Sequence, residues 1–156
     1  MGKNEYTDRM KELVLNWKLR LVVSALFSML GFAILIGTLS GYVMPEFETL
    51  DQTIVGVAVF VIVIPVYLIM ADLPKIDEHD IAEMLNERIP NLEHDANLIL
   101  VGEEELNEEE KARRNQLKDF FEDEKLYRFL PNYPIQQATV IMITCLILTA
   151  GIYFYL

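Results

Sequence analysis

The two histidines of the chain lie in the same short sequence context. His79 and His94 each stand in the middle of a Glu-His-Asp tripeptide, so that Asp80 and Asp95 follow them directly. Imidazole and carboxylate groups together bind zinc or iron, provided that the fold brings the two tripeptides together. Neither segment has the His-x-x-x-His or Glu-x-x-His spacing that fixes two ligands on one helix, and acidic residues near a helix start also complement the helix dipole. A small metal-dependent membrane enzyme using these four residues is therefore an alternative interpretation, not the leading one.

The sequence contains no other motif that would carry a reaction. There is no Gly-x-x-x-x-Gly-Lys phosphate loop and no Gly-x-Ser-x-Gly nucleophile turn, and the single cysteine, Cys145, cannot form an internal disulfide. We therefore expect no cofactor and no small-molecule substrate. The pattern favours a protein without catalytic activity.

Three stretches of the chain contain no charged residue, although 24% of all its residues are charged. They cover residues 21–44, 53–71 and 135–156. Each is close to the length of about 20 apolar residues with which a helix crosses a hydrocarbon core of about 30 Å. The remaining polar residues are too few to cover three such helices in water. The sequence therefore predicts an all-α integral membrane protein with three transmembrane helices.

The basic residues indicate how these helices are oriented. All 13 Lys and Arg lie either in residues 1–20 or in residues 72–134, whereas the loop 45–52 carries only acidic charges. Lys and Arg are retained on the cytoplasmic side of a membrane. We therefore expect segments 1–20 and 72–134 to be cytoplasmic and the loop and the C-terminus to be outside, in a bacterial inner membrane, with the first stretch as an uncleaved anchor.

Residues 1–20 are expected to form an amphipathic helix, because Met10, Leu13 and Trp17 recur at spacings of three and four. Aromatic and basic side chains beside an apolar stretch are typical of the headgroup level of a bilayer. By this criterion the predicted interface residues are Trp17, Lys18, Arg20, Tyr127, Phe129 and Tyr133. For residues 1–20, an extension of the first helix without contact to lipid is the alternative.

Small residues and a proline mark special positions within the spans. Ala33, Gly37 and Gly41 repeat every four residues, and they predict a face on which the chain's own second or third span packs closely, with a dimer partner as the alternative. Pro65 removes one hydrogen bond inside the second span and predicts a kink or hinge. The three uncharged stretches contain no Asp, Glu, Lys, Arg or His, which disfavours an ion pump or an ion channel acting alone.

Segment 72–134 is strongly acidic, with 18 acidic and 8 basic residues, and nucleic-acid binding is therefore disfavoured. Its apolar spacing predicts a small helical cytoplasmic insert between the second and third spans. The first helix is expected to begin after Asp77 and to stop before Pro90, the second to cover about 91–102, and the third to run from Asn107 to about Phe121. In the third helix, two i,i+4 ion pairs are expected, Glu109 with Arg113 and Glu110 with Arg114.

The order of two closely spaced spans, a short helical insert and a third span resembles the N-terminal membrane region of uncharacterised bacterial inner-membrane proteins. Within residues 80–101, the similarity rests on Leu85-Asn86, Pro90, Leu92-Glu93 and Leu98 to Leu100. The resemblance implies the three-span arrangement and implies no catalytic residue.

Taken together, these patterns favour a non-catalytic membrane subunit or scaffold. It would pack through its spans in a membrane complex, in contact with lipids, and present an acidic helical platform to a protein partner with a basic surface. Besides the metal-dependent enzyme, the other alternative is a lipid- or pore-associated accessory protein in which Pro65 and the aromatic residues of 120–133 act.

Overall fold

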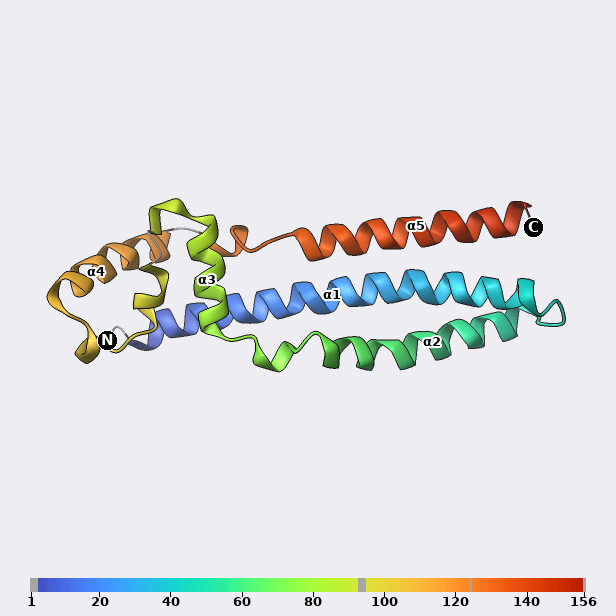
Figure 1. The fold of residues 1–156 in the computed structure, drawn as a ribbon, viewed down its shortest axis with the longest axis horizontal. Coiled ribbons are helices and arrows are strands. Elements are labelled where there is room, and N and C mark those ends of the chain that lie inside the picture. Colours follow the sequence, from blue (N-terminus) through green and yellow to red (C-terminus); the bar gives the residue numbers. More distant parts are fainter. Residues whose placement is uncertain (1–2, 93–94, 124, 156) are drawn as a thin grey trace. The chain divides into compact units, whose positions relative to one another are not determined.

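A computed structural model describes residues 3–92, 95–123 and 125–155, and all regular structure in these ranges is helical. The α-helices are α1 (Lys3–Val43), α2 (Thr49–Met70), α3 (Glu78–Arg88), α4 (Glu108–Asp123) and α5 (Tyr133–Tyr155) (Figure 1). Short 3-10 helices connect them: η1 (Leu73–Lys75), η2 (Pro90–Leu92), η3 (Asp95–Ile99), η4 (Glu103–Glu105) and η5 (Leu126–Arg128). The predicted all-α class is thus confirmed.

Three of these helices have the length and apolar composition that crossing a membrane requires. The segments are Asp8–Val43, Thr49–Lys75 and Tyr133–Phe154. The prediction of three such helices is confirmed. The second of these helices, α2, begins at Thr49, four residues before the uncharged stretch 53–71. Its start is capped within the acidic loop, where the backbone N–H of Glu48 donates to Asp51 Oδ2 at 3.0 Å.

The chain divides into two compact units. The acidic unit consists of Met1–Leu19 and Pro74–Pro131, and the span unit consists of Arg20–Leu73 and Asn132–Leu156.

The core of the acidic unit combines the N-terminal helix with the segment after the second span. Met10 is fully buried, and Leu13 and Trp17 are 5% and 8% exposed. The Arg9 guanidinium donates to the carbonyl oxygen of Phe121, whose ring is also fully buried. The apolar stripe formed by Met10, Leu13 and Trp17 is therefore covered by protein, and contact of this helix with lipid stays a prediction.

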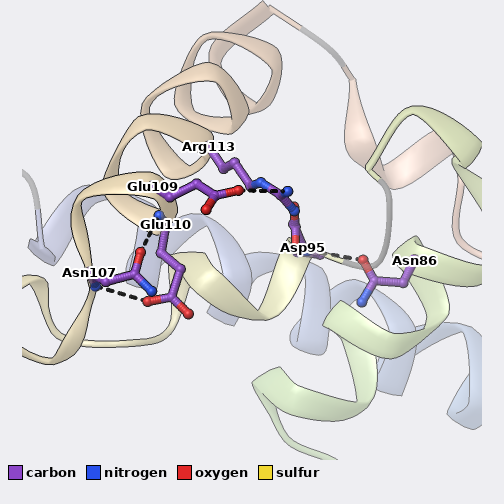
Figure 2. A network of polar contacts seen from close by, with 7 residues as sticks. Asn86, Asp95, Asn107, Glu109, Glu110 and Arg113 are labelled. Carbon is purple, nitrogen blue, oxygen red and sulfur yellow. Dashed lines mark hydrogen bonds and ion pairs between the residues drawn. The ribbon is translucent and has the colours of Figure 1, made fainter.

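The ends of α3 and α4 are set by local side-chain hydrogen bonds. Asp77 Oδ1 accepts from the backbone N–H groups of His79 and Asp80 at 2.9 and 3.2 Å, and the N–H of Asp77 donates to Asp80 Oδ2 at 2.9 Å. Asn107 and Glu110 form the same reciprocal arrangement at 2.8 and 2.9 Å (Figure 2). Both predicted helix starts are confirmed, because a short polar side chain satisfies the free N–H groups of the first turn.

The α-helix predicted over about 91–102 is wrong in type. The described part of this stretch forms the 3-10 helices η2 and η3. The Ala96 N–H, which an α-helix would direct to the carbonyl oxygen of Leu92, donates instead to Asn86 Oδ1 at 3.0 Å. Leu92, Ala96 and Ile99 are nevertheless buried, so the spacing identified the correct face for the core.

In the span unit, α1 lies between α2 and α5 (Figure 1). Gly31 of α1 approaches α5, since a Cβ atom built on it would lie 3.2 Å from the Cβ of Cys145. Gly37 of α1 approaches α2, where a Cβ would lie 2.7 Å from the carbonyl oxygen of Gln52. Glycine is needed at position 37 because the contacted atom belongs to the backbone of α2, whereas at position 31 the neighbouring atoms of α5 would have to move by a few tenths of an ångström to admit a side chain.

Candidate functional site

A group of exposed carboxylates lies where η4 leads into α4. Glu103, Glu104 and Glu105 form η4, and Glu108 and Glu109 stand in the first turn of α4; all five are exposed. We call these five residues the acidic surface. Acidic residues in the first turn stabilise a helix through its dipole, so the sequence supports this helix start while concentrating charge there.

One lysine partly neutralises the acidic surface. Lys111 Nζ lies 2.8 Å from Glu108 Oε1. The hydrogen bond from Lys111, together with its charge, lowers the pKa of Glu108. In return, the hydrogen bond to Glu108 raises the pKa of Lys111, to which the charge of Glu103 adds. Both groups face solvent, so water screens the pair strongly.

A second basic residue joins the acidic surface to η3. Arg113 Nη1 lies 3.2 Å from Asp95 Oδ2, and its Nη2 lies 3.1 Å from Glu109 Oε1, as Figure 2 shows. These contacts raise the pKa of Arg113, with the hydrogen bond to Asp95 as the largest cause. The predicted ion pair of Glu109 with Arg113 is confirmed. Because Asp95 lies on a different element, Arg113 also fixes α4 against η3.

The neighbouring arginine has a different environment from the one predicted. Arg114 is only 4% exposed, and its Nε and Nη1 have no hydrogen-bond partner in the described part of the chain. The carboxylate of Glu110, its predicted partner, accepts from the N–H of Asn107 at 2.9 Å instead. Burying the Nε and Nη1 groups of Arg114 without a hydrogen-bond partner among the described residues costs free energy.

Three of the four predicted metal ligands are described, and they have different surroundings. His79 is exposed, Asp80 belongs to the cap of α3, and Asp95 pairs with Arg113. His94 lies outside the described residues. Within the residues that are described, no group of three or more His, Cys, Asp and Glu side chains is placed to hold a metal ion. The metal site that includes His94 stays a prediction.

His79 does border a polar hollow of about 430 Å³ in the acidic unit. Glu83 and Glu87 follow it at spacings of four along α3, and Asn86 and Asn97 complete the lining. Glu83, Glu87 and Asn97 are not among the predicted site residues, although the four-residue spacing of Glu83 and Glu87 from His79 places these three side chains on one face of a helix.

The predicted helix-packing residues lie against the start of α2. A Cβ on Gly41 would lie 2.1 Å from Gln52 Nε2, and a Cβ on Gly56 of α2 would lie 2.9 Å from the carbonyl oxygen of Ala33. With the contact of Gly37 described above, all three small residues of α1 face α2. The contact of Gly37 and Gly41 with Gln52 was not predicted, because Gln52 lies one residue before the uncharged stretch 53–71.

The predicted interface residues differ in exposure. Trp17 is buried, whereas Tyr127 and Tyr133 are 46% and 61% exposed. Lys18 and Phe129 are half-buried, and Arg20 Nη1 donates to Asn132 Oδ1 at 2.8 Å within the span unit. Pro65 is exposed inside α2, which continues on both sides of it. The positions of these residues relative to a bilayer, and a hinge at Pro65, stay predictions.

Comparisons with protein-family models, curated proteins and solved structures find no match to the chain.

Proposed function

We propose that the chain is a non-catalytic integral membrane subunit that is anchored by α1, α2 and α5 and presents its acidic surface to a basic surface of a protein partner. The observation that carries the proposal is the acidic surface itself, with five exposed carboxylates on a locally ordered helix start. Such a concentration of like charge steers a partner of opposite charge toward one face.

The span unit supports the membrane part of the proposal. No residue of α2 is buried, and Val61, Ile62 and Ile69 are more than half exposed. Apolar side chains on every face of a helix require lipid or further helices around it. We place the N-terminus and the acidic unit in the cytoplasm and the α1–α2 connection and the C-terminus outside, on the distribution of Lys and Arg.

The orientation is tested with single cysteines at exposed positions. The variants Glu104→Cys and Glu46→Cys are made in a Cys145→Ala background and treated in intact cells with a membrane-impermeant maleimide. Labelling of Glu46→Cys alone is expected; labelling of Glu104→Cys alone would reverse the topology.

The partner is tested by purification in native nanodiscs from the source membrane, followed by mass spectrometry. The variant E103Q/E104Q/E105Q is expected to lose the co-purifying partner, because it removes three charges of the acidic surface. The control E12Q/E83Q/E87Q removes three exposed charges elsewhere and is expected to keep the partner. Recovery of the unaltered chain alone and monomeric would contradict the proposal.

A further inference from the structure

The span unit contains a groove between α1 and α2 with a volume of about 440 Å³. One end is polar and is lined by Thr38, Thr49, Gln52 and Thr53. The other end is apolar and is lined by Leu30, Val57 and Phe60. The groove therefore changes from polar to apolar along the direction of the helices.

The groove exists because its floor has almost no side chains. Ala33, Gly37 and Gly56 lie between its two walls, and the contacts of Gly37 and Gly56 bring the two backbones together without filling the space beside them. The hydroxyl groups of Thr38 and Thr53 donate to carbonyl oxygens of their own helices, at 3.0 and 2.7 Å. The donors of these two hydroxyl groups are thus satisfied, and their oxygen atoms can still accept hydrogen bonds.

The dimensions of the groove match one acyl chain. From Thr49 to Phe60, α2 advances about 16 Å, which is roughly half of a hydrocarbon core and so the depth of one leaflet. The volume lies in the range of about 300–1,000 Å³ that is typical of small-ligand sites.

The charges beside the polar end select the headgroup. Glu46 and Glu48 are exposed in the α1–α2 connection, Asp51 follows in the first turn of α2, and residues 45–52 contain no Lys or Arg. These carboxylates attract an ammonium group and repel a net negative headgroup. Tyr153 of α5 also borders the groove, and an aromatic ring adds a favourable surface for a cation.

We propose that this groove binds one acyl chain of a zwitterionic, ammonium-bearing phospholipid, with the headgroup beside Glu46 and Glu48. The proposal rests on the membrane insertion proposed above, but it is independent of the protein partner. Thr49, Gln52 and Thr53 face the ester region of the lipid, and Leu30, Val57 and Phe60 line the path of its chain.

The test uses the full chain in nanodiscs that contain equal amounts of phosphatidylethanolamine and phosphatidylglycerol with identical acyl chains. After transfer to detergent, native mass spectrometry counts the retained lipids. One phosphatidylethanolamine per chain is expected, with a preference of about fivefold over phosphatidylglycerol, as one screened charge contact provides. Equal retention of both lipids, or of neither, would overturn the proposal.

Two variants separate the groove from the general lipid surface. Val57→Trp places a large ring in the groove and is expected to abolish retention, while the matched Ile147→Trp on the exposed surface of α5 is expected to retain the lipid. E46Q/E48Q leaves the groove intact and is expected to reduce the headgroup preference. Unchanged retention in Val57→Trp, or a partner helix cross-linked at position 57, would contradict a lipid occupant.

Failure of lipid binding can be distinguished from failure of membrane insertion and from failure of partner binding. A chain that alkaline carbonate extracts from membranes would refute membrane insertion, whatever lipid it binds. E103Q/E104Q/E105Q is expected to lose the protein partner and keep the lipid, whereas Val57→Trp is expected to lose the lipid.

Discussion

The close approach of α1 and α2 predicts a graded response to Gly→Ala substitutions. At Gly37 the new Cβ would lie 2.7 Å from the Gln52 carbonyl oxygen, and at Gly56 it would lie 2.9 Å from the Ala33 carbonyl oxygen. Both contacted atoms belong to a backbone, so the helices must separate to admit the methyl group. Overpacking of this kind costs about 1–3 kcal/mol.

Substitutions at two further glycines, Gly41 and Gly151, are expected to change the free energy of unfolding less. At Gly41 the new Cβ would meet Gln52 Nε2 at 2.1 Å, but this is the end of a flexible side chain that can swing away. The expected cost is the hydrogen bond from Gln52 to the carbonyl oxygen of Phe47, about 0.5–1.5 kcal/mol. Gly151 meets nothing within 4 Å, so Gly151→Ala gains only the helix preference of alanine, about 0.5–1 kcal/mol.

All four substitutions gain the same helix preference, so the difference from Gly151→Ala isolates the packing cost. Reversible unfolding of the span helices in mixed micelles, followed by circular dichroism, measures the free energy of unfolding for each variant. The expected order of stability is Gly151→Ala, then Gly41→Ala, then Gly37→Ala and Gly56→Ala together. If Gly37→Ala were as stable as Gly151→Ala, the described approach of α1 to α2 would be refuted.

Three predictions concern the acidic unit. Arg114→Met is expected to raise the free energy of unfolding by about 1–3 kcal/mol, because it removes a buried guanidinium whose Nε and Nη1 have no hydrogen-bond partner in the described part of the chain; a loss of stability in thermal unfolding would contradict this expectation. The Glu108–Lys111 pair should stabilise the acidic unit at pH values above 4.5, the ordinary pKa of Glu108. This contribution is lost as the pH falls through the lowered pKa that Glu108 has in the folded state. For Lys111, whose pKa is raised above 10.5, the contribution is present below that value and is lost as pH rises through the raised folded pKa. When stability is measured against pH, the acidic loss should vanish in E108Q, and the alkaline loss should become smaller, because the charge of Glu103 still raises the pKa of Lys111. Asn86→Leu is expected to cost about 1–3 kcal/mol, because the buried Ala96 N–H loses its acceptor, and hydrogen exchange at Ala96 should become faster than in the unaltered protein.

The sequence alone determined the features that depend on neighbours within a few residues. The all-α class and the three apolar helices follow from uncharged stretches of sufficient length. The starts of α3 and α4 follow from Asp77 with Asp80 and from Asn107 with Glu110, where each side chain reaches an N–H three residues away. Such contacts form whenever the local backbone becomes helical, so no knowledge of the remaining chain is needed.

Tertiary structure decided the features that depend on distant segments. Asn86 takes the N–H of Ala96, ten residues away, and so produces 3-10 turns where the apolar spacing alone indicated an α-helix. Arg9 reaches the carbonyl oxygen of Phe121 across 112 positions, in a unit that also buries Trp17. The groove likewise requires that glycines of two helices meet. Small residues permit close approach, but which backbone approaches, and what space is left beside it, is fixed only by the packing of whole helices.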